Sequence, residues 1–135
     1  MNDSDIIFFI DRSLGRTHVA NALKSIGEKV EIHDEHFHQS ERDVIWLPEV
    51  SRRGWIILTA DKNIGRNQLE VQAVKSSFAR VFTLISKNLS GSEMGDIFVQ
   101  AIYSIKAIVK NSSAPFIARV YKDGSVKIWK DYKNS

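Results

Sequence analysis

Short apolar runs recur along the chain, and polar residues follow each of them. Two runs are almost unbroken, Ile6–Ile10 and Trp55–Ala60, and two are more mixed, Lys29–His33 and Arg80–Ile85. A run of about four to eight apolar residues is typical of a strand that is buried on both faces, as in a parallel sheet. The pattern therefore predicts four strands at these positions.

Segments with helical spacing lie between and after these strands. In residues 19–26 the apolar side chains recur at i, i+3, i+4 and i+7, which places them on one helix face. A second helix is expected around Trp46, a third from about residue 67 to 77, and the longest from Ser92 or a neighbour onward. Helices therefore alternate with the predicted strands.

The last part of the chain has a different pattern. From Phe116 to Trp129, apolar and polar residues alternate on either side of Asp123-Gly124. Alternation is typical of strands, and Asp-Gly tolerates the positive φ angles that a type I′ turn requires. A β-hairpin with such a turn is therefore expected.

The order of the predicted elements indicates an α/β fold. Strands that alternate with helices form a mostly parallel central sheet with helices on both faces, which gives three layers, α/β/α. The 135 residues show no internal repeat or linker. We expect a single domain over residues 1–135, with a core at about 6–110 and the C-terminal hairpin at about 115–130.

The composition excludes several classes of protein. The sequence contains no cysteine, which rules out disulfides, cysteine-ligated zinc, thiol nucleophiles and iron–sulfur clusters. No apolar run approaches the roughly 20 residues of a membrane helix, and the acidic start lacks the basic region of a secretory signal. We therefore expect a cytoplasmic protein with no membrane partner.

The charge is unevenly distributed. The net charge is +3, with −3 on residues 1–70 and +6 on residues 71–135. One interpretation is an ordinary solvated surface. The other is an acidic site that a polyanion approaches across basic surroundings.

Acidic residues directly follow two of the predicted strands. Asp11 comes after Ile6–Ile10, and Asp61 comes after Trp55–Ala60. In an open α/β sheet, sites form beyond the carboxyl ends of the strands. If the two strands are neighbours, both carboxylates lie at one edge of the sheet, and Asp43 can reach that edge from the intervening helix.

Carboxylates that converge in a crevice repel one another unless a cation compensates their charge. Mg²⁺ and Mn²⁺ prefer oxygen ligands, and such an ion can activate water and stabilise a phosphoryl transition state. Asp34 and Glu35 after the second strand, and Glu70 in the third helix, are further candidates for this site. The acids therefore indicate chemistry on a phosphodiester.

Each acid also has a purely structural interpretation. Asp11 and Asp61 can simply end strands, because Asp is common in turns. Asp43 stands three residues after Ser40, a spacing that fits a capping box at a helix N-terminus. Glu70 can be a solvated helix residue. The sequence leaves both interpretations open for each residue.

The loop after the second strand contains a group of residues of metal-ligating type: His33, Asp34, Glu35, His36 and His38. A Zn²⁺ or Mn²⁺ site in this loop is an alternative to the acidic site, although no helical His-x₃-His spacing is present. Ordinary surface histidines are the simpler interpretation.

Several other motifs are absent. The chain has no G-x-G-x-x-G or P-loop sequence for nucleotides and no G-x-S-x-G nucleophile elbow. A receiver-like signalling domain would show an acidic pair after the first strand, whereas Arg12 follows Asp11. These absences favour a site made of the strand-ending acids.

Three segments carry a family resemblance: FFIDRSLG, GEKVEIHDEHF and ERDVIWLPEVSRRGWIILTADKNI. Their order and spacing are similar to those of PIN-like ribonuclease domains, some of which are toxins of VapC-type toxin–antitoxin pairs. The resemblance spans about residues 6–85. Asp11 matches the acid after the first strand, Asp43 the acid before the Trp-bearing helix, and Asp61 the acid of the LTxD strand end.

The resemblance implies cleavage of RNA with Mg²⁺ or Mn²⁺. In this interpretation Asp11, Asp43 and Asp61 hold the metal, and Glu35 or Glu70 completes the site or orients water. Four cations flank these acids in the sequence and would bind RNA phosphates, unless they are ordinary surface charge: Arg12, Arg16, Lys62 and Arg66.

The resemblance also implies partners, namely RNA and a cognate antitoxin protein. The sequence does not determine the oligomeric state, and a homodimer is an open alternative. Two other function classes remain. One is a non-catalytic PIN-like module that binds nucleic acid or protein, and the other is the receiver-like signalling domain.

Overall fold

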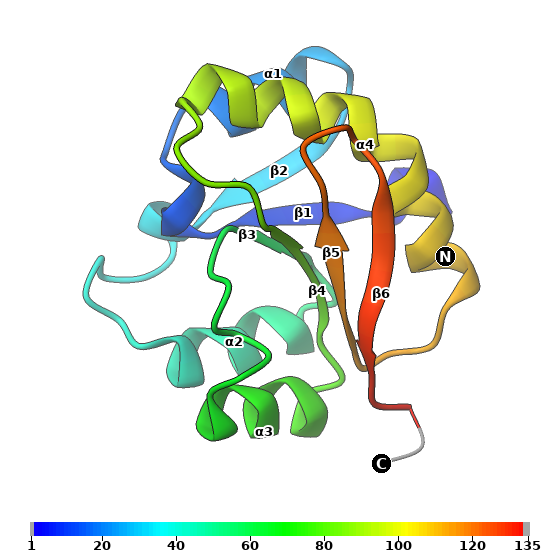
Figure 1. Ribbon diagram of the computed structural model, residues 1–135. Helices are drawn as coiled ribbons and strands as arrows, with labels where there is room; N and C mark the ends of the chain where they lie inside the picture. The colour runs from blue at the N-terminus through cyan, green and yellow to red at the C-terminus, as the bar shows by residue number, and fades with distance from the viewer. Residues whose placement is uncertain (1, 134–135) are drawn as a thin grey trace.

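The computed structural model describes residues 2–133 and contains a six-stranded sheet in the order β2-β1-β3-β4-β5-β6. The strands are β1 (Ile7–Ile10), β2 (Lys29–Ile32), β3 (Ile56–Thr59), β4 (Arg80–Leu84), β5 (Phe116–Val120) and β6 (Val126–Asp131). The four strands expected from the apolar runs are all present. The hairpin extends the same sheet beyond β4 (Figure 1).

The sheet is mostly parallel. Strand β1 lies between β2 and β3 and is parallel to both, and Phe8 of β1 is paired with Ile56 of β3. Strands β4 and β5 continue the parallel order, and only β6 is antiparallel to its neighbour. The carboxyl ends of β1 and β3 therefore lie side by side at one edge, as the site prediction requires.

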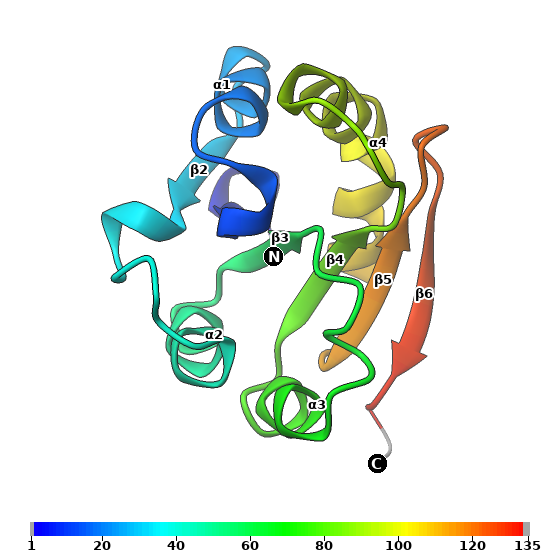
Figure 2. The ribbon, with the colours of Figure 1, turned by 60° about the vertical axis from the view of Figure 1, so that its left-hand side comes forward.

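Helices cover both faces of the sheet. The α-helices are α1 (His18–Ser25), α2 (Asp43–Arg52), α3 (Gln68–Ser76) and α4 (Gly91–Asn111), and the short 3₁₀ helices are η1 (Asp3–Asp5), η2 (Arg12–Leu14) and η3 (His33–Glu35). Helices α1 and α4 pack together over one face, and α2 and α3 over the other (Figures 1 and 2). The three-layer α/β/α architecture is confirmed.

The two faces explain why the strand sequences are unbroken apolar runs. Phe8 and Ile10 point into the core under α1 and α4, whereas Phe9 between them points into the core under α2 and α3. Ile57 of β3 likewise faces the opposite side from its neighbours Ile56 and Leu58. Because both faces are covered, most positions along a central strand are apolar.

The start of α2 differs from the expected capping box. The N-cap is Arg42, which makes no side-chain capping bond, and Ser40 lies outside the helix. Asp43 is the first helical residue, and its carboxylate accepts a hydrogen bond from the Trp46 indole N–H at 2.9 Å. A capping box is instead found at α4, where Ser90 and Glu93 bond each other's backbone N–H groups.

The turn of the hairpin also differs from the expected type I′. The Gly124 N–H donates to the Tyr121 carbonyl at 2.9 Å, and Gly124 has a φ of +86° while Asp123 does not adopt a positive φ. Three residues, rather than two, separate the paired positions Tyr121 and Ser125. A longer hairpin loop of this kind places its glycine in the left-handed region after an ordinary turn.

No helix within residues 2–133 has both the length and the apolar character needed to cross a membrane. The longest, α4, carries charged residues along its exposed side, such as Asp96 and Lys110.

Candidate active site

The strand-ending acids meet at the carboxyl edge of the sheet. Asp11 follows the last residue of β1, and Asp61 lies two residues beyond the end of β3. The Asp11 N–H donates to the Leu58 carbonyl at 3.0 Å, which continues the pairing of the two strands past the end of β1. The adjacency of β1 and β3 therefore brings these two acids to the same place.

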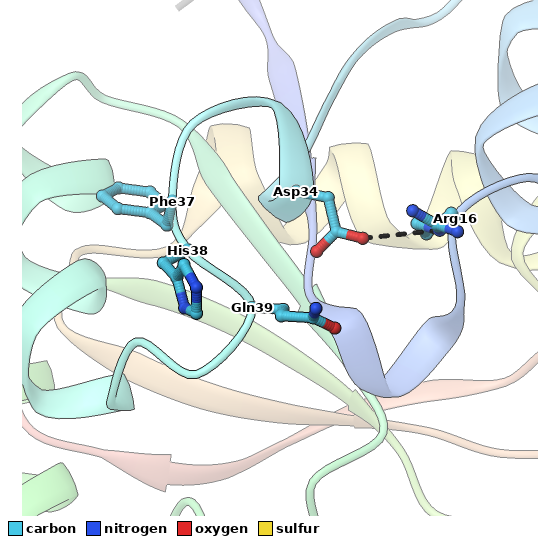
Figure 3. A pocket seen from close by; sticks show the side chains of 5 residues that line it. All are labelled: Arg16, Asp34, Phe37, His38 and Gln39. Atoms are coloured by element: carbon cyan, nitrogen blue, oxygen red, sulfur yellow. Dashed lines mark ion pairs between the residues drawn. The ribbon is translucent and has the colours of Figure 1, made fainter.

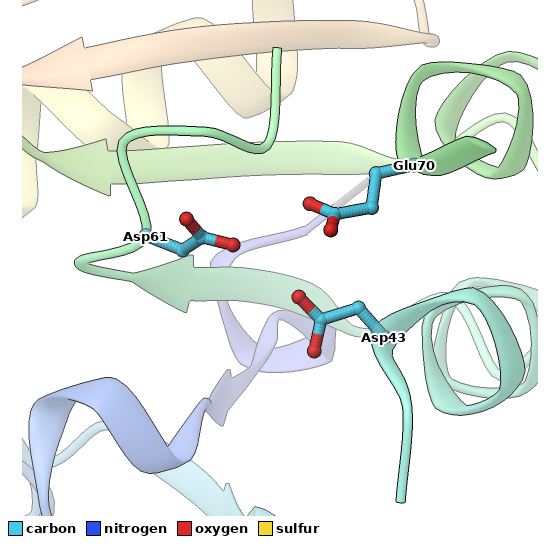
Figure 4. Close-up of side chains that lie close together, drawn as sticks. All are labelled: Asp43, Asp61 and Glu70. Atoms are coloured by element: carbon cyan, nitrogen blue, oxygen red, sulfur yellow. The ribbon is translucent and has the colours of Figure 1, made fainter. Parts of the chain in front are cut away.

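Three carboxylates converge most closely at this edge: Asp43, Asp61 and Glu70. One oxygen from each lies within 4.8 Å of the others. Figure 4 shows the three side chains pointing toward one another from the start of α2, the loop after β3 and the first turn of α3. Glu70 is thus part of the group, although its sequence position is equally compatible with a solvated helix residue.

The convergence changes the acidity of two of these groups. Burial, followed by the nearby charge of Asp11, raises the pKa of Asp43 to about 6, against the effect of the Trp46 hydrogen bond. Burial, followed by the charges of Asp61 and Asp43, raises the pKa of Glu70 to about 7. Carboxylates that are both desolvated and close to like charge favour the protonated form or a bound cation.

The chain supplies no such cation. Within residues 2–133, no lysine, arginine or histidine forms an ion pair with Asp43, Asp61 or Glu70. The Oε1 atom of Glu70 is buried and receives no hydrogen bond from the described residues. The charge of this group is therefore uncompensated by the protein itself.

Asp11 borders this group but has a different environment. Its side chain is buried, and its two carboxylate oxygens accept three hydrogen bonds. The Arg12 N–H donates to Oδ1 at 2.8 Å, and the hydroxyls of Ser13 and Thr59 each donate to Oδ2 at 2.7 Å. Asp11 therefore lies outside the close triad of carboxylates, and its own oxygens are largely satisfied by the chain.

Two threonines support Asp11 and Asp61. The Thr59 hydroxyl, which donates to Asp11, also accepts a hydrogen bond from the Asp61 N–H at 3.0 Å. The buried Thr83 hydroxyl of β4 donates to the Asp61 carbonyl at 3.0 Å. Sequence reasoning does not find Ser13, Thr59 or Thr83. The one local signal is that Ser13 and Thr59 each lie two residues from a strand-ending acid.

The comparison with known families agrees with this arrangement. The family described as "PIN like domain" matches residues 6–86, which is more than half of the chain and contains all the acids of the site. The chain belongs to the PIN-like domain family. The expected relationship to VapC-type PIN-like domains is also confirmed.

One curated protein extends the similarity beyond the family match. "Putative ribonuclease VapC45" of Mycobacterium tuberculosis (strain ATCC 25618 / H37Rv) is 28% identical over 124 residues, which covers 89% of each chain. No solved structure gives a significant match. Because 89% of the chain is covered, the similarity extends beyond the matched family segment and includes α4.

The cations after β1 are paired in this PIN-like domain. Arg12 and Arg16 each place Nε 3.4 Å from a carboxylate oxygen of Asp34, and Arg12 also donates to Gln39. Arg16, Asp34 and Gln39 line a cavity of about 270 Å³ with two residues of the same loop (Figure 3). Asp34 thus pairs with both arginines and does not join the close acidic triad.

The cations after β3 have a different setting. Lys62 and Arg66 line a second cavity, of about 280 Å³, next to β4 and β5. The Arg66 guanidinium lies 5.8 Å from the ring centroid of Trp129 on β6. The four cations singled out from the sequence therefore form two pairs. Arg12 and Arg16 share the Asp34 carboxylate, whereas Lys62 and Arg66 have no carboxylate partner among residues 2–133.

The histidine site does not form. His33 is buried, and its ring packs against Phe37 and Trp46 with centroids 5.6 Å away in each case. His36 bonds the Glu31 carboxylate at 2.6 Å, and His38 bonds the Ser40 hydroxyl at 2.7 Å. The three rings have separate partners because one turns into the core and the others toward the loop surface.

Glu35 also lies apart from the acidic triad. It ends η3 on an exposed part of the loop. The cluster among residues 2–133 whose geometry could hold a metal ion does not include it. Of the two glutamates left open by the sequence, Glu70 is the one that faces Asp43 and Asp61.

Proposed function

We propose that this PIN-like domain is a Mg²⁺- or Mn²⁺-dependent endoribonuclease and the toxin of a toxin–antitoxin pair. The observation that carries the proposal is the convergence of Asp43, Asp61 and Glu70 within 4.8 Å, without a compensating cation from the chain. Family membership supports the nuclease class, and the name of the relative supports ribonuclease activity.

The donor set fits a hard divalent cation. All three groups offer carboxylate oxygens, which Mg²⁺ and Mn²⁺ prefer. The buried, unpartnered Oε1 of Glu70 and the raised pKa values of Glu70 and Asp43 mean that the chain itself stabilises the ionised carboxylates poorly, which is the stabilisation that a divalent cation would supply. Asp43, Asp61 and Glu70 would hold the ion, which when bound activates water and stabilises charge on the phosphoryl group.

The surrounding residues fix the geometry of this site. Asp11 adds a fourth negative charge and, through the Thr59 hydroxyl, restrains the backbone of Asp61. The Trp46 indole holds the Asp43 carboxylate, and the Thr83 hydroxyl holds the Asp61 carbonyl. In this proposal the chain orients the metal-binding oxygens before an RNA phosphodiester arrives, so little reorganisation is required.

The proposal includes the expected partners and location. RNA is the substrate, an antitoxin protein inhibits by blocking the acidic site, and the whole chain acts as one cytoplasmic domain. A homodimer is compatible with this proposal but is not needed for it. The alternative is a PIN-like module that retains the acids and binds nucleic acid or protein without cleaving.

Cleavage by purified protein tests the proposal. Total RNA is incubated with wild type in Mn²⁺ or EDTA, and with Asp61→Asn and Asp11→Asn in Mn²⁺. Asp96→Asn, an exposed change on α4, serves as the matched control. We expect Mn²⁺-dependent cleavage by wild type and by the control only. RNA left intact by wild type with Mn²⁺ would favour the non-catalytic module.

The growth of cells that express the protein tests toxicity separately from RNA cleavage by the purified protein. Wild type and the same variants are induced at matched soluble levels. The proposal requires wild type and Asp96→Asn to slow growth, and Asp11→Asn and Asp61→Asn not to. Equal toxicity of all four proteins would show that the acids do not carry the effect.

A further inference from the structure

A cavity of about 280 Å³ lies beside the acidic site, where the hairpin joins the sheet. Six residues line it, and four of them are cations: Lys62, Arg66, Thr83, Ile85, Lys87 and Arg119. They come from the loop after β3, from β4 and the loop that follows it, and from β5. This volume is several times the roughly 30 Å³ that one water molecule occupies in the liquid. A phosphate group therefore fits.

The positive charges in this cavity are available to a ligand. Among residues 2–133, none of Lys62, Arg66, Lys87 and Arg119 forms an ion pair. The Nε–H of Arg119 is buried and has no hydrogen-bond acceptor within the described chain. A buried donor without an acceptor is unfavourable unless a ligand supplies one.

An aromatic ring, rather than a carboxylate, holds the arginines. The Arg119 guanidinium lies 3.8 Å and the Arg66 guanidinium 5.8 Å from the ring centroid of Trp129. The same ring covers Gly65, where a Cβ atom would approach it to 2.2 Å, so only glycine permits this packing. Cation–π contact orients a guanidinium but leaves its net charge uncompensated.

Two residues that line the cavity are neighbours of Asp61 in the acidic site. Lys62 follows Asp61 in the chain, and Thr83, which lines the cavity, donates to the Asp61 carbonyl at 3.0 Å. An anion in the cavity would therefore lie close to the acidic triad without contacting it. A strand with a regular series of phosphates can place one at the triad and a neighbouring one in the cavity.

We infer that the cavity of Lys62, Arg66, Lys87 and Arg119 binds a backbone phosphate of the RNA strand adjacent to the phosphodiester that is cleaved. This inference rests on the proposed function, because it takes RNA as the substrate. The planar guanidinium of Arg119 can donate two parallel hydrogen bonds to one phosphate, and the lysines add charge. Trp129 is a positioning residue that keeps the two arginines in place.

Binding without cleavage tests the inference independently of nuclease activity. The anisotropy of a short fluorescein-labelled single-stranded RNA is titrated with full-length protein in EDTA, over a range of salt concentrations. The variants are Lys87→Gln and Arg119→Gln. Lys24→Gln, which removes an exposed charge at the end of α1, is the matched control.

We expect Kd to rise about tenfold in Arg119→Gln and about threefold in Lys87→Gln, and not in Lys24→Gln. The slope of log K against log salt should become shallower by about 0.7 for each phosphate of a single strand that the variant no longer neutralises. Equal weakening in all three variants would indicate non-specific charge attraction and overturn the inference. Unchanged binding in Lys87→Gln and Arg119→Gln would do the same.

The Trp129 variants test positioning without changing charge. Trp129→Leu should raise Kd as Arg119→Gln does, and Trp129→Phe, which keeps an aromatic ring, should restore most of the affinity. If Trp129→Leu does not fold, Arg119→Lys provides a second test. This substitution keeps the positive charge but removes the paired N–H donors of the guanidinium. An affinity of Arg119→Lys equal to wild type would contradict the assigned phosphate contact.

Competition with inorganic phosphate shows whether the cavity binds a phosphate of an RNA strand or free phosphate. If the cavity serves the RNA strand, phosphate at the RNA's total phosphate concentration should leave the bound fraction unchanged. Efficient displacement, abolished in Arg119→Gln, would identify a free-phosphate site and overturn the inference. If RNA binds in the predicted way but is never cleaved with Mn²⁺, the proposed function fails while the phosphate site stands.

Discussion

Two kinds of carboxylate lie within one edge of this sheet. Asp11 is only 7% exposed, yet its oxygens accept three hydrogen bonds from Arg12, Ser13 and Thr59. Asp43 and Glu70 are more exposed and have fewer donors, with one indole N–H for Asp43 and none for the Oε1 of Glu70. The most buried acid is thus the best satisfied.

The difference indicates a division of roles. Hydrogen bonds to the ionised form stabilise a buried carboxylate without a counter-ion, as at Asp11. Carboxylates that converge with few donors, as at Asp43, Asp61 and Glu70, are stabilised in the ionised form by an external cation. We therefore expect Asp11 to act mainly by positioning the site and the other three acids to act by binding metal.

The largest effect is expected on metal affinity. Asp61→Asn should lower the affinity for Mn²⁺ by at least about 100-fold, since even residues that only support metal ligands contribute about 10- to 100-fold. Asp11→Asn should lower it by less, about 10- to 100-fold, because Asp11 supports the site from outside the triad. Calorimetric titration of Mn²⁺ measures both. Equal losses would mean that Asp11 is itself a ligand.

The second-largest effect is expected at the Thr59 hydroxyl, which lies between Asp11 and Asp61. Thr59→Val keeps the shape of the side chain but removes the donor to Asp11 and the acceptor for the Asp61 N–H. The free energy of unfolding should fall by about 2 kcal/mol, because the buried Asp11 carboxylate and the partly buried Asp61 N–H each lose a hydrogen bond. Urea unfolding at neutral pH measures this. An unchanged free energy of unfolding would show that water replaces the hydroxyl.

The triad should give the metal-free protein a distinctive pH dependence. The folded-state pKa of Glu70 is about 7, above its ordinary 4.5, so the folded state binds its proton more tightly than the unfolded state. Stability from this group is therefore present below about pH 4.5 and is lost as the pH rises toward 7. Asp43, raised from 3.8 to about 6, acts in the same direction.

Glu70→Gln should remove its part of this dependence. At pH 7.5 the metal-free variant should be more stable than wild type by about 1 kcal/mol, a value reduced for solvent screening of a partly exposed group. At pH 4.5 the two proteins should differ little. Thermal unfolding in EDTA at both pH values measures the difference. Added Mn²⁺ should stabilise wild type but not the variant.

The smallest effect is expected at Ser13, the exposed residue whose hydroxyl donates to Asp11. Ser13→Ala removes the hydroxyl that donates to Asp11 and accepts from the Ala60 N–H. Because Ser13 is exposed, water can replace it, and the loss of unfolding free energy should be about 0.5 kcal/mol. A loss as large as that of Thr59→Val, in the same urea experiment, would mean that both hydroxyls are equally essential.

Local pattern predicted the framework of this molecule correctly. The runs at Ile6–Ile10 and Trp55–Ala60 became β1 and β3, because only a strand covered on both faces requires such unbroken apolar sequence. Asn67 caps α3 at the expected boundary through bonds to two backbone N–H groups. These features depend on neighbours in sequence, and so the sequence is sufficient to find them.

Local pattern was misleading where two local rules fit the same residues. Ser40 and Asp43 have the spacing of a capping box, yet Asp43 turns to Trp46 and the acidic site. Asp123-Gly124 suits a type I′ turn, yet only Gly124 adopts a positive φ. At α2 the Asp43 carboxylate joins the acidic site instead of capping the helix, and in the hairpin a longer loop needs a positive φ only at Gly124.

The sequence by itself determined the alternation of strands and helices, the parallel sheet and the acids that end β1 and β3. The tertiary structure decided which acids converge, because Asp43, Asp61 and Glu70 meet only through the strand order and the packing of α2 on α3. It also decided which cations have a carboxylate partner: Asp34 pairs with Arg12 and Arg16, across up to 22 positions of the chain. Charge and hydrogen bonding act over a few ångströms in space, and distance along the chain does not reveal that proximity.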